Sequence, residues 1–289
     1  MLELRDTGAP AIPRLDLRAA SADGAEIGAE LARASVLVLS GHGVDAAGCD
    51  RAAAAAARAF ALPRAVKERY RGPRNGTQRG YLPLRTRLPN GRETLDRKEA
   101  WHARPDGHAA ANLFPREVPE LGPSLLGLLA RLELVAERVL GGIGAFLGRP
   151  RGFFEERVRA GDSLLRVNHY PERSVTGERA RFLAHQDFDL VTLLLGASAP
   201  GFEVQTRDGV WRGVDCAPAE IVLTAGDLLA IESDGRIAST PHRVVAPETC
   251  DGGRTSMAYF VSPRPEVMLA SGVSAGAFVD ARLREAGYA

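Results

Sequence analysis

Residues 202–214, FEVQTRDGVWRGV, decide the fold class of this chain. Two runs of alternating residues flank Asp208-Gly209, and this dipeptide between such runs is typical of a tight β-hairpin. Similar short runs recur on both sides without helical segments between them, at residues 164–170, 191–195, 220–223, 228–232, 242–246 and 255–261. About seven or eight short strands separated by turns predict an antiparallel barrel or a double-sheet jelly roll.

The N-terminal half has mostly helical patterns. Asp45 stands at a capping position before the alanine-rich run that ends at Phe60, and Pro63 suits the first turn of a short helix. Apolar residues at steps of three and four predict a long amphipathic helix over residues 124–147, and residues 274–286 also have a helical pattern. We therefore expect one domain over residues 1–289, with a mostly helical N-terminal layer (1–160), a β core that carries the site (161–265) and a C-terminal helix (266–289).

The composition is ordinary for a soluble globular protein, with 45% hydrophobic and 25% charged residues. The 37 basic and 36 acidic residues give a net charge of +1, and no block of like charge indicates nucleic acid or a membrane surface as a partner. Cys49, Cys216 and Cys250 share no Cys-x-x-Cys spacing, so neither a disulfide framework nor structural zinc is expected. The sequence shows no secretory signal and no run near the roughly 18 apolar residues of a membrane span, which predicts a soluble, cytoplasmic protein.

The motif His185-Gln186-Asp187 is a candidate for part of a metal site. Side chains at i and i+2 of a strand point to the same face, so in a strand the imidazole and the carboxylate would converge on one ion. His242 begins a later predicted strand. Two histidines and one carboxylate on one face of an octahedral ion leave three adjacent positions open, as in non-haem iron(II) oxygenases. A His-x-Asp pair alone is more often structural, so the prediction depends on the neighbouring motifs.

Two other predicted strands supply polar side chains at alternate positions. Asn168 and Tyr170 alternate on one of them, and Arg254 and Ser256 alternate on the other. A lone buried arginine is costly without an anionic partner. The Arg254 guanidinium group and the Ser256 hydroxyl are suited to bind the distal carboxylate of a dicarboxylic ligand.

Together these motifs resemble those of the isopenicillin N synthase-like family of iron(II)- and 2-oxoglutarate-dependent dioxygenases, over nearly the whole chain. In the N-terminal half, "AIPRLDL" and "VLVLSGHGVD" resemble two strands of the family, "FALPRAVKERY" resembles its Phe-x-Leu-Pro helix, and "RGYLPL" and "DRKEAW" resemble the loop and Lys-Glu strand that follow. In the core, "LRVNHYP", "AHQDFDLVTLLL", "PHRVV" and "RTSMAYFVSP" resemble its Asn-x-Tyr, His-x-Asp, distal-histidine and Arg-x-Ser motifs. Each motif alone is modestly specific, but their order and joint presence are highly specific.

The resemblance implies a double-stranded β-helix, which is a jelly roll and agrees with the strand pattern. It implies iron(II) ligands and contacts to the co-substrate 2-oxoglutarate, namely His185, Asp187 and His242 for the metal, and Arg254, Ser256, Tyr170 and Asn168 for 2-oxoglutarate. It also implies that O2 and 2-oxoglutarate are consumed, with release of succinate and CO2. The oxidised substrate would be a small molecule, such as an amino acid or a specialised metabolite, that undergoes hydroxylation, desaturation or ring closure.

Four further residues are candidates for the substrate pocket. The arginine-rich stretch after Gly72 has the composition of a solvated loop, but the family builds the mouth of its substrate pocket from this region. Arg79, Tyr81 and Arg85 are therefore candidate substrate contacts. Phe260 lies further along the predicted strand of Arg254 and suits either the pocket lining or the core.

Other histidines and acids near the motifs are interpreted as structural. His169 alternates to the strand face opposite the predicted 2-oxoglutarate contacts. Asp189 also follows the first histidine at an even spacing, but it lies outside the His-x-Asp pattern, so we assign it a polar role at the strand edge. His102 and His108 fall in segments with irregular patterns and are expected to be exposed.

Three alternative functions stay open from the residues alone. Isopenicillin N synthase uses its Arg-x-Ser pair for a substrate carboxylate, so this motif does not exclude an oxidase of the same family without 2-oxoglutarate, although Asn168 favours the co-substrate. A zinc hydrolase also uses three protein ligands but would have no role for Arg254 and Ser256. An inactive binding protein on a jelly-roll scaffold is compatible with the fold, but such a protein would be expected to lose metal ligands.

Overall fold

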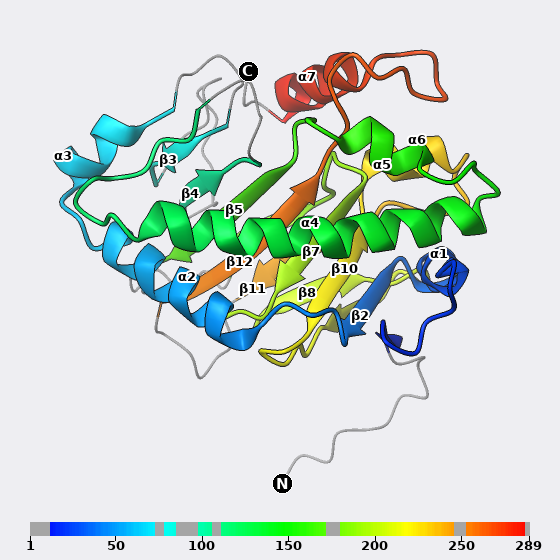
Figure 1. Ribbon diagram of the computed structural model, residues 1–289, viewed down its shortest axis with the longest axis horizontal. Coiled ribbons are helices and arrows are strands. Elements are labelled where there is room, and N and C mark those ends of the chain that lie inside the picture. Colours follow the sequence, from blue (N-terminus) through cyan, green and yellow to red (C-terminus); the bar gives the residue numbers. More distant parts are fainter. Residues whose placement is uncertain are drawn as a thin grey trace, which may run out of the picture.

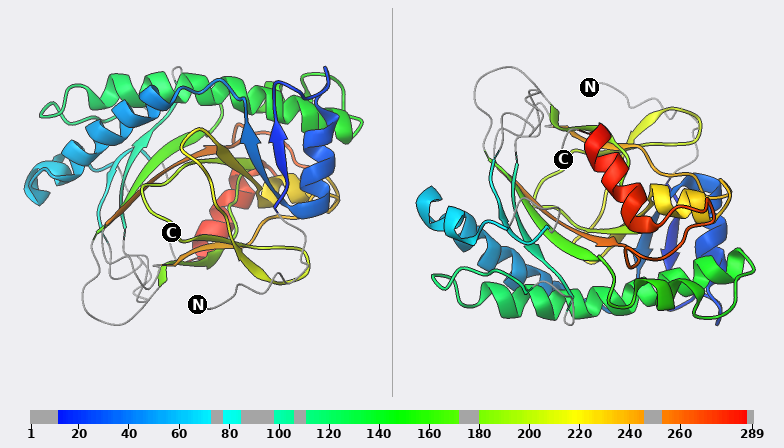
Figure 2. Two further views of the ribbon diagram at one scale, coloured as in Figure 1. Left: turned by 90° about the horizontal axis from the view of Figure 1, so that it is seen from below. Right: turned by 90° about the horizontal axis from the view of Figure 1, so that it is seen from above.

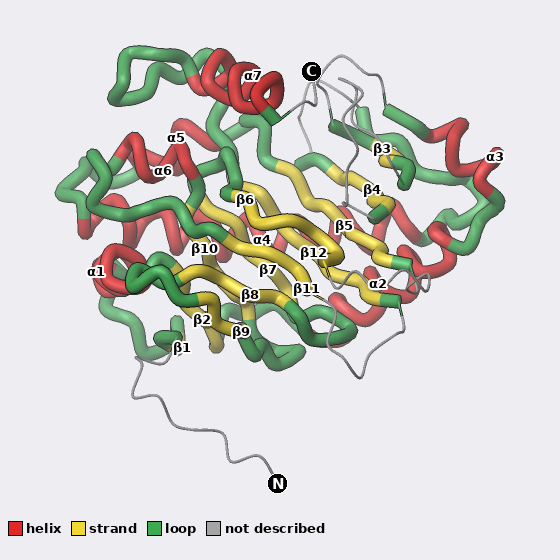
Figure 3. Tube along the Cα trace, turned by 180° about the vertical axis from the view of Figure 1, so that it is seen from behind, coloured by secondary structure: helices red, strands yellow, loops and turns green. Residues whose placement is uncertain are grey.

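Two β-sheets lie face to face (Figure 2, Figure 3). Each contributes side chains to one interior pocket. The structure is a computed structural model that describes residues 12–72, 78–84, 98–105, 111–171, 180–245 and 253–286, with residues 180 and 181 described by their backbone only. The larger sheet has eight strands in the order β1-β2-β10-β7-β12-β5-β4-β3, and the smaller sheet has four in the order β6-β11-β8-β9. This is the predicted jelly roll.

Each described strand belongs to one of these two sheets. The larger sheet contains β1 (Arg14–Asp16), β2 (Val36–Ser40), β3 (Gly80–Leu82), β4 (Glu99–Ala103), β5 (Leu164–Tyr170), β7 (Val191–Leu195), β10 (Ile221–Ala225) and β12 (Arg254–Val261). The smaller sheet contains β6 (Ala180–His185), β8 (Phe202–Gln205), β9 (Trp211–Gly213) and β11 (His242–Val245). Only the β1–β2 pair is parallel among the strand pairs that the structure describes.

The longest helices cover the outer face of the larger sheet, where α4 crosses the central strands (Figure 1, Figure 2). The helices are α1 (Ala25–Ala34), α2 (Ala46–Phe60), α3 (Arg64–Lys67), the 3-10 helix η1 (Glu68–Tyr70), α4 (Leu121–Phe146), α5 (Phe153–Val158), α6 (Asp227–Glu232) and α7 (Ala275–Glu285). No helix in the described part of the chain is both long and apolar enough to cross a membrane. Cys49 and Cys216 are free thiols, and Cys250 lies outside the described residues.

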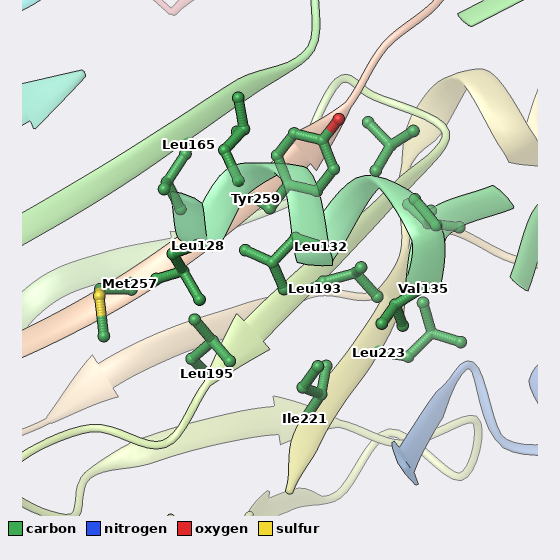
Figure 4. Packing of buried hydrophobic residues seen from close by; sticks show 14 of the residues in the cluster. Leu128, Leu132, Val135, Leu165, Leu193, Leu195, Ile221, Leu223, Met257 and Tyr259 are labelled. Atoms are coloured by element: carbon green, nitrogen blue, oxygen red, sulfur yellow. The ribbon is translucent and has the colours of Figure 1, made fainter. Parts of the chain in front are cut away.

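Packing between α4 and the sheet determines which side chains face the interior. Leu128 and Leu132 of α4 pack on Leu165 of β5, Leu193 of β7 and Tyr259 of β12 within one buried cluster (Figure 4). Successive side chains of a strand point to opposite faces. The residues between these positions therefore point away from α4, into the space between the two sheets.

Local features of the structure confirm several sequence predictions. Asp208-Gly209 connects β8 to β9, and Gly209 has a φ of +79°, a left-handed conformation that glycine adopts without strain. The side chain of Asp45 caps α2 by accepting a hydrogen bond from the backbone N–H of Gly48, at 3.2 Å. Ser274 caps α7 in the same way.

Two elements differ from their predictions. Residues 228–232, predicted as a strand, form most of α6, and a five-residue apolar run cannot by its pattern alone distinguish the two. Strand β6 was not predicted. The segment 1–160 contains β1, β2, β3 and β4 as well as helices, and these strands extend both edges of the larger sheet.

Candidate metal centre and its pocket

His185, Asp187 and His242 meet in the pocket between the sheets. His185 ends β6 and His242 begins β11, and the two are directly paired across these antiparallel strands, with ring centres 4.2 Å apart. The Nε2 atoms of both histidines lie 3.7 Å from the Asp187 carboxylate oxygens. One ligand atom from each residue lies within 4.8 Å of the others, which is the spacing of three ligands around one ion.

Asp187 reaches this position from a loop and not from a strand. Strand β6 ends at His185, and the Asp187 carbonyl accepts a hydrogen bond of 2.9 Å from the backbone N–H of Asp227, at the start of α6. The prediction that the two side chains converge holds, but its reason, a shared strand face, was wrong.

Backbone carbonyls orient both imidazole rings. His185 Nδ1 donates to the Leu183 carbonyl at 2.8 Å, and His242 Nδ1 donates to the Thr240 carbonyl at 3.0 Å. A carbonyl oxygen only accepts, so each Nδ1 carries the proton and each Nε2 lone pair points to the centre. Burial and then the neighbouring His242 lower the pKa of His185 to about 3, so its ring is neutral at pH 7, as a metal ligand must be.

Thr192 connects Asp187 to a second carboxyl group. Its hydroxyl Oγ1 lies 2.6 Å from Asp187 Oδ2 and 2.9 Å from Asp189 Oδ2. Burial and then the charge of Asp187 raise the pKa of Asp189 well above its usual value, and the Thr192 hydroxyl is placed to donate to either carboxyl group. Asp189 is 3% exposed and lies behind the centre, which corrects its predicted place at a strand edge.

The predicted 2-oxoglutarate contacts face the centre from the larger sheet. Arg254 of β12 is directly opposite Tyr170 of β5, and Ser256 is directly opposite Asn168, so the four residues form two neighbouring cross-strand pairs. All four are buried and line the same pocket as the two histidines and Asp187. Arg254 Nε donates to the Ala199 carbonyl at 3.1 Å, and its guanidinium group lies 5.4 Å from the centre of the Tyr170 ring.

Asn168 lines the same pocket and has a buried side-chain oxygen. Its Oδ1 atom is buried and has no hydrogen-bond partner among the residues that the structure describes. Buried polar atoms are nearly always hydrogen-bonded in native proteins, so this acceptor indicates that a donor such as a water molecule occupies the pocket beside it. The co-substrate 2-oxoglutarate offers only acceptor oxygens, so the buried N–H and O–H donors of Arg254 and Ser256 are the groups that suit it beside the proposed metal ligands.

The predicted substrate contacts have different surroundings. Phe260 lines the pocket. The Tyr81 hydroxyl donates to Glu99 at 2.5 Å, and Arg79 Nη1 donates to the Ala111 carbonyl at 3.1 Å, so neither side chain is among those lining the pocket. Arg85 lies outside the described residues.

Two neighbouring strands, β4 and β5, carry His102, His169 and Arg166. His169 stacks on Phe60 of α2 with ring centres 5.0 Å apart, which confirms that it faces away from the pocket. His102 is 2% exposed within β4, so its predicted exposure was wrong, and His108 lies outside the described residues. Sequence reasoning missed Arg166, which lines the pocket. Its position two residues before Asn168 on the same strand was the pattern that could have found it.

Two family profiles match this chain. Residues 161–263 match the 2OG-Fe(II) oxygenase superfamily, and residues 12–122 match the non-haem dioxygenase in morphine synthesis N-terminal family. The first match spans the metal residues and the predicted 2-oxoglutarate contacts.

Relatives and solved structures agree with these profiles. Validamycin A dioxygenase of Streptomyces hygroscopicus subsp. limoneus is 30% identical, over 92% of this chain and 81% of its own length. Leucoanthocyanidin dioxygenase 2 of Oryza sativa subsp. japonica is 29% identical, over 91% and 74%. A 2OG-Fe(II) oxygenase family protein from Caulobacter crescentus is 32% identical and superimposes with a TM-score of 0.82, covering 96% of this chain and 100% of its own. The chain therefore belongs to the 2OG-Fe(II) oxygenase superfamily and is an iron(II)- and 2-oxoglutarate-dependent dioxygenase.

Proposed function

We propose that His185, Asp187 and His242 bind the iron(II) of this dioxygenase. The supporting observation is the donor set itself, in which two oriented imidazoles and one carboxylate face one point. This set suits iron(II) and leaves adjacent coordination positions free. Bound iron(II) and 2-oxoglutarate supply the activation of O2 and the oxidation of the substrate, with succinate and CO2 as co-products.

We further propose that Arg254 and Ser256 bind the distal carboxylate of 2-oxoglutarate, with Tyr170 and Asn168 as neighbours. The guanidinium group presents parallel N–H donors, which match the two oxygens of a carboxylate. The Ser256 hydroxyl lies on the next inward position of the same strand and can donate a further hydrogen bond. These residues orient the co-substrate, and the apolar side chains of Leu194 and Phe260 exclude water from the same pocket.

The substrate that we propose is a specialised metabolite, oxidised in the cytoplasm by hydroxylation, desaturation or ring closure. Relatives named for leucoanthocyanidin and validamycin A support a metabolite of this kind. The pocket lies between the two sheets, and the net charge of +1 gives no electrostatic basis for binding nucleic acid or a membrane.

Anaerobic reconstitution tests the assigned residues. We expect the wild-type protein with iron(II) and 2-oxoglutarate to develop a weak visible charge-transfer band, and to release succinate when oxygen is admitted. Asp187→Ala should abolish both signals. Arg254→Met should keep iron binding but raise the 2-oxoglutarate requirement about a hundredfold, because it removes charge-assisted hydrogen bonds to a buried carboxylate.

Arg243→Met provides the matched control. Arg243 follows the metal ligand His242 on β11, but its side chain pairs with Glu203 at 2.7 Å and stacks over Trp211. It is not among the residues that line the pocket, so its loss should leave the band and the 2-oxoglutarate requirement unchanged. An unchanged requirement in Arg254→Met would show that the co-substrate binds elsewhere.

A further inference from the structure

Asp187 is the proposed metal ligand that lies outside the strands. It belongs to the loop after β6, and a backbone hydrogen bond of 2.9 Å from the N–H of Asp227 fixes its carbonyl group. A second backbone hydrogen bond, of 3.0 Å from the N–H of Leu228 to the Asp189 carbonyl, fixes the loop two residues later. These contacts hold the main chain, but they leave the Asp187 side chain free to rotate.

The two histidines do not orient this carboxylate by themselves. His185 Nε2 lies 3.7 Å from Asp187 Oδ1, and His242 Nε2 lies 3.7 Å from Asp187 Oδ2. Backbone carbonyls hold the proton of each ring on Nδ1, so both Nε2 atoms face the centre without a proton. An unprotonated nitrogen donates no hydrogen bond to a carboxylate. A donor from another residue is therefore needed to set the Asp187 side chain.

Thr192 of β7 supplies such a donor. Its Oγ1 atom lies 2.6 Å from Asp187 Oδ2, the distance of a charge-assisted hydrogen bond from a hydroxyl to a carboxylate. Among the residues that the structure describes, no other side chain or backbone group donates to the Asp187 carboxylate. Thr192 is 4% exposed, and a β-branched side chain in a strand has few rotamers. Its hydroxyl group is thus held in a fixed position beside the carboxylate.

Asp189 holds the Thr192 hydroxyl group from the other side. Its Oδ2 atom lies 2.9 Å from Thr192 Oγ1. Asp189 is itself buried against Gly226, where an added Cβ atom would lie 2.3 Å from Asp189 Oδ1. The hydroxyl group has one proton for two acceptors, and its shorter contact is the one to Asp187. Of these three polar side chains in a row, those of Asp187 and Thr192 line the pocket.

Building on the function proposed above, we propose that Thr192 is a positioning residue of the iron(II) site, whose hydroxyl group orients the Asp187 carboxylate towards the point that both histidine nitrogens face. Thr192 acts only through Asp187 and touches neither the metal nor the co-substrate. A ligand that is oriented before the metal arrives needs less ordering on binding. The loss of such a supporting hydrogen bond typically lowers metal affinity about 10- to 100-fold.

Three substitutions separate the hydroxyl group of Thr192 from its shape. Thr192→Val keeps the branched shape without a donor, and we expect the Kd for iron(II) to rise about tenfold or more. Thr192→Ser loses a methyl group but keeps the donor, so the Kd should stay within about threefold of the wild-type value. Thr192→Cys keeps only a weak S–H donor and should give an intermediate Kd.

Competition with a chromophoric chelator measures the Kd for iron(II), anaerobically and without 2-oxoglutarate. Thermal unfolding of the metal-free proteins shows whether each variant is folded. If Thr192→Val does not fold, the comparison of Thr192→Ser with Thr192→Cys decides, because these two side chains are similar in size and differ in donor strength. Weaker iron(II) binding by the cysteine variant supports the proposal, and equal binding contradicts it.

The visible band of the protein saturated with iron(II) and 2-oxoglutarate provides a second readout. The energy of this band depends on how the protein ligands donate to the metal, and a change in packing that leaves the ligands in place does not move it. We expect the band of Thr192→Val to lie at a different wavelength from that of the wild type. The band of Thr192→Ser should coincide with the wild-type band.

Thr224→Val is the matched control. Thr224 of β10 is directly opposite Thr192 in the larger sheet and is 3% exposed, so it has the same residue type and similar burial. Within the part of the chain that the structure describes, its hydroxyl group makes no hydrogen bond to Asp187 or Asp189. Its loss should leave the Kd for iron(II) and the wavelength of the band unchanged.

The outcomes separate this inference from the proposed function. A wild-type protein that binds no iron(II) would overturn the proposed metal centre and the role of Thr192 with it. A wild-type protein that binds iron(II), together with an unchanged Kd and band in Thr192→Val, would overturn only the role of Thr192. Equal weakening in Thr192→Val and Thr192→Ser, or in Thr192→Val and Thr224→Val, would also overturn it, because packing or pocket polarity would then explain the loss.

Discussion

His102 is buried in β4, near the basic side chains of Arg166, Arg104 and Lys98. This environment makes the stability of the protein depend on pH. Burial is the main cause that lowers the pKa of His102, and the three positive charges add to it. The unfolded chain has a histidine pKa of about 6.5. Below that pH the unfolded state binds a proton that the folded state cannot, so His102 stabilises the fold above about pH 6.5 and loses this contribution as the pH falls.

We expect His102→Gln to flatten this acid dependence. Glutamine keeps an oxygen acceptor for Arg166 but does not titrate. The free energy of unfolding of the wild type should therefore fall by about 1 kcal/mol more than that of the variant between pH 6 and pH 5. Urea unfolding of the metal-free proteins at pH 8, 6 and 5 measures these free energies. The difference between the two proteins at pH 8, where histidine is neutral in both states, gives the effect of the substitution on stability without protonation. Parallel losses in both proteins would mean that His102 is protonated in the folded state.

Individual residues show which features the sequence could predict and which it could not. The motif around His185 indicated two of the three proposed metal ligands by residue type and spacing, and strand alternation placed Asn168 and Tyr170 on one face. His102 was expected to be exposed because the stretch around it is rich in glycine, proline and arginine. Its burial depends on the pairing of β4 with β5, which brings His102 opposite Arg166 across 64 residues of sequence. Local composition carries no information about such a pairing.

Helix α4 separates the packing function of the central strands from their chemical function. Its buried leucines pack on one face of β5, β7 and β12 (Figure 4). The other face of the same strands lines the pocket. Its spacing of apolar residues at three and four predicted this helix well. Elements α6 and β6 were harder, because six-residue segments contain too few turns or alternations to identify their period.

Two leucines on α4 test this packing. Leu132 is fully buried and Leu134, on the same helix, is 59% exposed. We expect Leu132→Ala to lower the free energy of unfolding by roughly 3 kcal/mol, because it removes buried methyl groups and leaves a cavity between helix and sheet. Leu134→Ala should change it by about 0.5 kcal/mol or less. Urea unfolding measures both, and equal losses would show that this face of α4 does not form the core contact.

At the scale of the whole molecule, the two halves of the proposed site belong to different sheets. The two histidines of the proposed metal centre end and begin strands of the smaller sheet, and Arg254 and Ser256 belong to β12 of the larger sheet. The resemblance implied that both sets share one site, but strand alternation within each segment could not show it, because the shared pocket depends on how the sheets face each other. A ligand that contacts both sets connects the two walls of the jelly roll.

This arrangement predicts that iron(II) and 2-oxoglutarate stabilise the fold cooperatively. A ligand at about one hundred times its Kd stabilises a protein by about 2.7 kcal/mol. If 2-oxoglutarate bridges the metal and Arg254, its stabilisation should be small alone and large after iron(II) is bound, so the shift in Tm with both ligands should exceed the sum of the separate shifts. Anaerobic thermal unfolding of four samples (no ligand, each alone, both) measures this coupling.

Two variants show which wall each ligand needs. Arg254→Met should keep the iron(II) shift and lose most of the additional shift from 2-oxoglutarate, because only the contact with the larger sheet is removed. Asp187→Ala should lose the Tm shift caused by iron(II) and most of the Tm shift caused by 2-oxoglutarate. Without the metal, the co-substrate can contact only the residues of the larger sheet. Strictly additive shifts in the wild type would mean that the two ligands bind independently and that no bridge between the sheets forms.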